Sequence, residues 1–312
     1  VYMCGHSHID VAWLWTVKEA ERKAVRTFAN TLDFMDAYPD FKFAQSQAVL
    51  YDTVKRNAPE IFERIKEKVK NGQWEVIGNA WVEADTNIAS GESLIRQLLY
   101  GREFFVREFG VDSTVYWLPD CLGFSWSLPQ IIKKADIDYF MTTKISWNEF
   151  DKFPFDTFMW RGIDGTEVLS HFIPTLKCDA EGYQTTYNGD LGPDQVIGGW
   201  RRYSNKDVNR NVLFSYGWGD GGGGPTRDML EKGRRMSAGI EGCPVVKQEF
   251  ARDFFDRLAK EVEGSDRLPV WSGELYLEFH RGTLTAQARN KKYNRKSEYL
   301  YQDAETLGVL AK

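Results

Sequence analysis

Short apolar segments alternate with amphipathic segments along most of this chain. Strand-like runs are predicted at residues 1–5, 41–44, 74–77, 115–118, 139–142, 168–172 and 212–216. Such alternation is typical of a largely parallel sheet with covering helices, because parallel strands need long crossover connections. We therefore predict an α/β fold in which seven largely parallel strands form a barrel. In such folds the functional side chains lie at the carboxyl ends of the strands.

Capping residues mark where the helices between these strands begin and end. Thr16 and Glu19 have the spacing of a capping box, which predicts a helix that ends before Pro39. Ser90 is expected to begin a helix that ends at Gly110. From about residue 285 the chain is helix-forming and rich in charge, without strand signals. We predict a catalytic domain over residues 1–284 and the beginning of a helical domain over 285–312.

Composition excludes several functional classes. The formal net charge of −5 provides no basic surface for nucleic acid. Aromatic residues make up 14% of the chain, which suits both a carbohydrate-handling surface and a well-packed core. There are four scattered cysteines, no C-x-x-C pair, no signal peptide and no long apolar run. A reduced, cytoplasmic protein without a membrane span is the simplest expectation.

Polar residues follow the first predicted strand in the segment His6-Ser7-His8-Ile9-Asp10. Alternate residues of an extended segment share one face, so His6, His8 and Asp10 are expected to point the same way. Imidazole and carboxylate groups that project together are typical of half a zinc site. Simple hydration of a strand end accounts for the same pattern. Trp13 adds a flat apolar surface on which a sugar could stack.

Three later segments carry similar chemistry. Asp120 lies in a Trp-Leu-Pro-Asp-Cys-Leu-Gly-Phe turn after a predicted strand, with Phe124 as a candidate substrate contact. Asp220 precedes four consecutive glycines, which are costly in backbone entropy unless the chain must pass close to another group. The Lys-Ser/Thr of a phosphate-binding Walker loop does not follow them. His280 lies in a Glu-Phe-His-Arg-Gly-Thr segment.

These four segments, in this order and spacing, resemble the N-terminal catalytic domain of the family 38 glycoside hydrolases, the retaining zinc-dependent α-mannosidases. The resemblance covers roughly residues 1–285, and 285–312 resembles the start of that family's helical middle domain. It implies hydrolysis of terminal α-linked mannose from mannosides or high-mannose oligosaccharides. It also implies one Zn²⁺ ion per chain, with Trp13 beside the sugar and with the metal ligands His8, Asp10, Asp120 and His280.

The resemblance gives Asp120 a second role, as the nucleophile that forms a covalent glycosyl-enzyme. A retaining glycosidase also needs a carboxyl group roughly 5 Å away that acts as acid and then as base. Asp220 is our choice because flanking glycines let its loop fold over the leaving group, while Asp85 and Glu83 stay open as alternatives. Asp85 is also a candidate substrate contact, and Lys144 either contacts a sugar hydroxyl at the rim or is simply solvated.

Two other functions deserve comparison. Metal-dependent polysaccharide deacetylases typically present an H-x-x-x-H pair, and the histidines at positions 6, 8, 171 and 280 form none. A catalytically inactive carbohydrate-binding fragment is disfavoured by the nucleophile position that Asp120 occupies. Because the family's enzymes continue into further domains, we expect this chain to bind zinc but to be weakly active or inactive by itself. An oligomer is not excluded.

Overall fold

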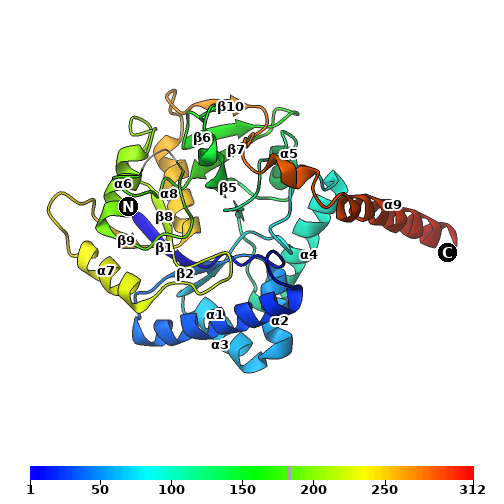
Figure 1. Cartoon of the computed structure of the whole chain (residues 1–312), viewed down its shortest axis with the longest axis horizontal. Helices are drawn as coiled ribbons and strands as arrows, with labels where there is room; N and C mark the ends of the chain where they lie inside the picture. Colours follow the sequence, from blue (N-terminus) through cyan, green and yellow to red (C-terminus); the bar gives the residue numbers. More distant parts are fainter. Residues whose placement is uncertain (181–183) are drawn as a thin grey trace.

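The computed structural model describes residues 1–180 and 184–312, whose strands form two five-stranded sheets (Figure 1). The first sheet is parallel, with the order β3-β2-β1-β8 and with β9 also paired to β1. Its strands are β1 (Tyr2–His6), β2 (Phe43–Gln45), β3 (Trp74–Val76), β8 (Leu213–Tyr216) and β9 (Lys247–Gln248).

The second sheet has the order β10-β6-β7-β5-β4. Its strands are β4 (Val115–Trp117), β5 (Tyr139–Thr142), β6 (Thr157–Arg161), β7 (Glu167–Phe172) and β10 (Val270–Ser272). All of its pairings are parallel except the one between β6 and β7, which is antiparallel. The expected largely parallel α/β fold is therefore confirmed.

A closed seven-stranded barrel is not confirmed, because hydrogen-bonded pairing among the described strands stops at two places. Between β3 and β4, the side chain of Asn79 donates to the Ser113 carbonyl (2.7 Å) and accepts from its N–H (3.1 Å). Between β7 and β8, the N–H of Leu213 donates to Nε2 of His171 (3.3 Å). Side chains thus bridge both gaps, and residues of both sheets share one apolar core that includes Cys4 and Met141.

Helices cover the outside of the sheets, with α1, α2 and α3 packed together below the first sheet in Figure 1. The α-helices are α1 (Val17–Ala37), α2 (Ala48–Asn57), α3 (Pro59–Lys70), α4 (Gly91–Phe109), α5 (Leu128–Lys134), α6 (Pro193–Arg202), α7 (Arg227–Ser237), α8 (Ala251–Val262) and α9 (Ala288–Leu310). Two short 3₁₀ helices are η1 (Lys144–Trp147) and η2 (Arg281–Leu284).

The predicted starts of α1 and α4 are confirmed, but of these two helices only α4 has a side-chain cap. The helix α1 begins after Thr16, whose side chain makes no capping hydrogen bond, so the predicted capping box is not formed. Ser90 caps α4 by accepting from the N–H of Ser93, and Gly110 ends it with a φ of 68°. No capping pattern in the sequence marks the start of α2, because the residue before it, Gln47, makes no side-chain cap and has a φ of 66°.

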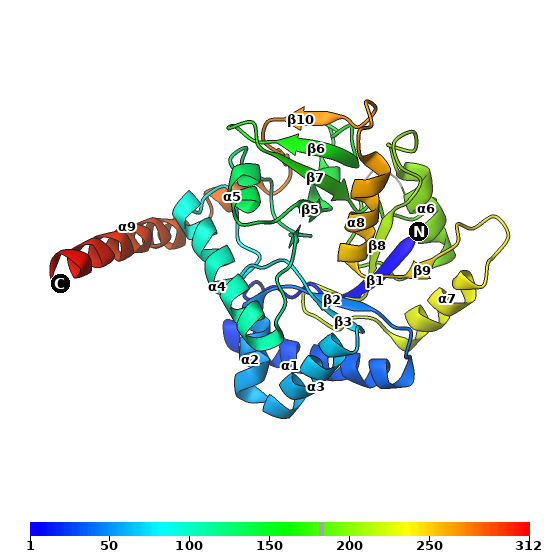
Figure 2. The same cartoon turned by 180° about the vertical axis from the view of Figure 1, so that it is seen from behind.

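The last helix, α9, projects away from the rest of the molecule in both views (Figures 1 and 2). Its middle and later turns are tied to the beginning of α4, where Glu298 accepts from the N–H of Ser90 (3.0 Å) and Arg96 pairs with Glu305. The predicted helical character of this region is confirmed, while its assignment to a separate domain stays a prediction. No described helix has the length and apolarity to cross a membrane.

Candidate active site

One imidazole and three carboxylates meet at the carboxyl ends of the strands. His8 and Asp10 follow β1, Asp120 follows β4, and Asp220 follows β8. One ligand atom from each of these four side chains lies within 4.8 Å of the others. Both sheets contribute to this group, which we call the His8 group. The sequence named all four residues, and the fold brings them together because the carboxyl ends of its parallel strands converge.

His8 is the most buried member of the group, with 4% of its surface exposed. Its Nε2 lies 3.3 Å from Oδ1 of Asp10 and 3.8 Å from Oδ2 of Asp120. On the other side of the ring, Nδ1 lies 2.8 Å from Oε2 of Glu83. Burial by itself would lower the pKa of His8, but the negative charges of Glu83 and Asp10 outweigh it and hold the pKa well above its usual value.

Asp120 is paired with a buried lysine. Nζ of Lys144, in η1, lies 2.5 Å from Oδ1 of Asp120 and 4.1 Å from the centre of the Trp147 ring. Lys144 is 7% exposed, so it is neither a solvated rim lysine nor a side chain that projects freely toward substrate. Its place against Asp120 gives it the role of orienting that carboxylate.

Asp220 is held by its loop and by two side chains. Oδ1 of Asp220 accepts from the hydroxyl of Tyr187 (2.7 Å) and from Nδ2 of Asn188 (3.3 Å). The Tyr187 ring also packs edge-on against His8, with 5.1 Å between ring centres. Burial and the nearby charges of Asp120 and Asp220 raise the pKa of Tyr187, so it stays a hydrogen-bond donor. Tyr187 lies in no recognisable sequence motif, so it could not be predicted.

The glycine loop packs directly against the His8 segment, as the run of glycines suggested. Ile9 pairs with Gly221, and the N–H of Asp10 donates to the carbonyl of Asp220 (2.8 Å). A Cβ at Gly219 would lie 2.1 Å from Oδ1 of Asn188, so any side chain there would displace that amide from beside Asp220. Asp220 itself has a φ of 59°, a left-handed conformation that aspartate tolerates better than most residues.

His280 is not part of the His8 group. It is exposed, has a φ of 60°, and precedes η2, with its ring 6.2 Å from the ring of Trp147. The structure therefore puts the carboxylate of Asp220, rather than this imidazole, beside the other three candidate ligands.

The remaining candidates have different surroundings. Trp13 is 60% exposed, next to Trp15. Phe124 is 1% exposed and packs against Phe140 and Trp160, so it belongs to the core and offers no surface to a substrate. Asp85 accepts from the backbone N–H groups two and three residues later, which makes it a turn-forming residue.

His6 has a structural role and does not face the same site as His8. Its Nδ1 lies 2.9 Å from the carbonyl of Ala44, and its Nε2 accepts from the indole N–H of Trp117 (3.2 Å). Burial lowers the pKa of His6 to about 4, so it is neutral at ordinary pH. Both nitrogens are thereby used inside the core, and neither is left for a metal.

The donor set of the His8 group fits a divalent cation. Its three carboxylates are close enough to repel one another, and among the described residues Lys144 is the cation in contact with them. One nitrogen and several oxygens are ligands that zinc accepts. The group can therefore hold a metal ion.

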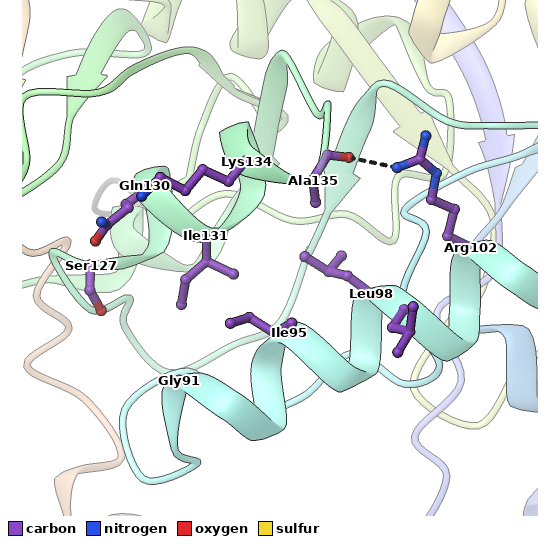
Figure 3. Close-up of a pocket in the computed structure, with 10 residues that line it drawn as sticks. Gly91, Ile95, Leu98, Arg102, Ser127, Gln130, Ile131, Lys134 and Ala135 are labelled. Atoms are coloured by element: carbon purple, nitrogen blue, oxygen red, sulfur yellow. Dashed lines mark hydrogen bonds between the residues drawn. The ribbon is translucent and has the colours of Figure 1, made fainter.

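A separate cavity of about 580 Å³ lies on the outside of the fold, between α4 and α5 (Figure 3). Ile95 and Leu98 of α4 face Ile131 of α5 across it, and Arg102 donates to the carbonyl of Ala135 (3.4 Å). The described residues that line this cavity include no histidine, aspartate or glutamate. It is mostly apolar and lacks the cluster of titratable side chains that the His8 group brings together.

Comparison with protein families gives a direct match for residues 1–274, to the N-terminal domain of glycosyl hydrolases family 38. The chain belongs to glycosyl hydrolase family 38. Among its relatives in this family, it is 43% identical over 309 residues to α-mannosidase G of Dictyostelium discoideum and 41% identical over 311 residues to α-mannosidase 2C1 of Homo sapiens.

These alignments include 98% and 100% of this family 38 chain but only 27% and 29% of the two relatives. The chain thus spans less than a third of their length. Its fold is similar to the crystal structure of an α-mannosidase from Enterococcus faecalis, with a TM-score of 0.70 at 21% identity. That similarity covers 88% of this chain and 30% of the other.

Proposed function

We propose that this chain is the catalytic domain of an α-mannosidase that hydrolyses terminal α-linked mannose with retention of configuration. The observation that carries the proposal is the closeness of Asp120 and Asp220, which contribute atoms within 4.8 Å of each other. Retaining glycosidases keep their two carboxyl groups about 5–5.5 Å apart, whereas inverting enzymes need about 6.5–9.5 Å to admit a water. The choice of mannose as the sugar rests on the relatives, which are named α-mannosidases.

In this proposal the two carboxylates divide the work. Asp120 attacks C1 of the mannose while Asp220 gives its proton to the leaving oxygen, which leaves the sugar covalently bound to Asp120. Asp220 then takes a proton from the water that attacks C1 and releases mannose. Because Tyr187 donates to Oδ1 of Asp220, the proton to be delivered lies on Oδ2. Lys144 keeps the Asp120 carboxylate oriented.

The metal in this proposal is a single zinc ion. His8, Asp10 and Asp120 would hold it, and family resemblance makes His280 the fourth ligand. Zinc supplies positive charge that fixes hydroxyl groups of the sugar and balances the carboxylates. Asp220 is bonded to Tyr187 and Asn188, which suits the acid role better than metal binding. His280 can complete the shell only if the segment around η2 moves toward the His8 group.

A fluorinated mannosyl fluoride tests the chemistry, because it forms the glycosyl-enzyme faster than it releases it. The zinc-loaded protein should gain the mass of one sugar, and peptide mapping should place the label on Asp120. Labelling needs a single turnover, so it detects even a slow enzyme. A folded, zinc-loaded sample that takes no label, or one labelled at Asp220, would contradict the proposal.

A further inference from the structure

Glu83 is a buried carboxylate that contacts His8 from behind the His8 group. It lies in the connection between β3 and α4, and 4% of its side chain is exposed. Its Oε2 is 2.8 Å from Nδ1 of His8, and its Oε1 accepts from the hydroxyl of Ser46. A carboxylate this deeply buried needs partners, and it finds them in these two side chains.

The backbone around Glu83 is tied to the same place. The N–H of Glu83 donates to Oε1 of Gln47 (3.2 Å), and Nε2 of Gln47 donates to the carbonyl of Ile9 (2.9 Å). Gln47 thus joins Glu83 to the residue that follows His8. Together with Ser46, it fixes the carboxylate relative to the imidazole from the end of β2.

The two nitrogens of His8 therefore face different surroundings. Nε2 faces Asp10 and Asp120, at 3.3 and 3.8 Å, while Nδ1 faces Glu83. Nδ1 of His8 and Oε2 of Glu83 are both buried, and among the described residues neither makes an aligned hydrogen bond. At 2.8 Å, Oε2 of Glu83 lies within hydrogen-bond distance of Nδ1 of His8.

We propose that Glu83 is the positioning residue for His8. By accepting the proton of Nδ1, it holds the tautomer whose Nε2 lone pair points at the metal, and its charge makes that nitrogen a stronger donor. This role rests on the proposed function in one respect, namely that His8 binds a metal. It also removes Glu83 from the candidates for the general acid, because one of its oxygens accepts from Ser46 and the other faces Nδ1 of His8.

Zinc affinity, measured by competition with a chromophoric chelator, tests this role without relying on activity. Glu83→Ala should weaken zinc binding by roughly 10- to 100-fold, the usual cost of losing such an outer partner. Glu83→Gln keeps an oxygen that can accept from Nδ1 but loses the charge, so its affinity should lie between those of wild type and Glu83→Ala. Loading with Co²⁺ should give a shifted visible spectrum in both variants.

Glu75→Gln is the matched control. Glu75 is a partly buried carboxylate that accepts from the N–H groups of Ala251 and Arg252 at the start of α8, and His8 is not among its described contacts. Its zinc affinity and Co²⁺ spectrum should equal those of wild type. A thermal melt of each variant checks that it is folded. If Glu83→Ala does not fold, the zinc affinity of the near-isosteric Glu83→Gln tests the role of Glu83.

The outcomes separate this inference from the proposed function. If Asp10→Ala loses zinc while both Glu83 variants bind it as tightly as wild type, the role of Glu83 is overturned and the metal site stands. If wild type does not bind zinc, or Asp10→Ala binds it equally well, the proposed metal site is itself contradicted. Weaker binding in the Glu83 variants, with Glu75→Gln unchanged, supports the inference.

Discussion

Two buried histidines, His8 after β1 and His171 within β7, have opposite electrostatic surroundings. His171 is in β7, where Nδ1 lies 2.8 Å from the Thr157 hydroxyl and Nε2 accepts from the N–H of Leu213. The Thr157 hydroxyl also contacts that of Tyr203 (2.6 Å). His8 instead faces carboxylates through both of its nitrogens.

Charge, rather than burial, separates the two regions. Burial lowers the pKa of His171 to about 4, although the charge of Asp156 opposes the shift, and Asp156 itself is paired with Arg202. Around His8 the carboxylates outnumber the contacting cation, and they reverse the effect of burial on its pKa. The polar groups around His171 satisfy one another and join two sheets, whereas those around His8 retain negative charge that a cation can balance.

Removing a carboxylate from the His8 group should have the largest effect. Asp10→Ala should weaken zinc binding about 100- to 1000-fold, because one of four ligands accounts for about 3–4 kcal/mol of a typical zinc binding energy. Chelator competition measures the change. The same loss of affinity on replacing Asp156, beside His171, would break the contrast between the two regions.

The His171 region should respond to acid instead of metal. The folded-state pKa of His171 is about 4, against about 6.5 unfolded, so between these values the unfolded chain binds more protons. Its contribution to stability is complete above pH 6.5 and is lost as the pH falls toward 4, by about 3 kcal/mol in all. Urea unfolding at pH 7 and pH 4.5 should therefore show that the free energy of unfolding falls less on acidification in His171→Asn than in wild type. An unchanged loss would contradict this account.

A smaller effect is expected from the lysine that contacts Asp120. Lys144→Met should lower the free energy of unfolding of the metal-free protein by about 2 kcal/mol, somewhat less than breaking a fully buried pair costs, since Asp120 keeps some access to water. Bound zinc should reduce this loss, because it also compensates the carboxylate. Lys133→Met, which breaks an exposed pair with Asp138, should change stability by less than about 1 kcal/mol.

Residues at strand ends were the easiest to predict. His8, Asp10, Asp120 and Asp220 were all named from the sequence, because polar residues after buried strands gather where parallel strands end. Tyr187 was not, since its segment has no motif and its contacts with His8 and Asp220 depend on tertiary structure.

Other assignments could not be made from local pattern. Sequence alone does not show whether an aromatic residue in a turn faces outward, where it could stack on a sugar, or inward, as Phe124 does. The position of a lysine after a strand does not show whether it is buried or which group it contacts. The contact between Lys144 and Asp120 therefore became visible only in the structure. The division into two sheets could not be predicted either, because between β7 and β8 a side chain, that of His171, takes the place of backbone pairing. The cytoplasmic location stays a prediction.

The most direct test is a crystal structure of the zinc-loaded protein with anomalous data collected at the zinc edge. We expect one strong anomalous peak for a zinc ion bonded to Nε2 of His8 and to carboxylate oxygens of Asp10 and Asp120. Glu83 should lie on the opposite side of the imidazole. The same map decides whether His280 or Asp220 is the fourth ligand. A folded protein with no peak at the His8 group, or with zinc bound elsewhere, would contradict the central claim.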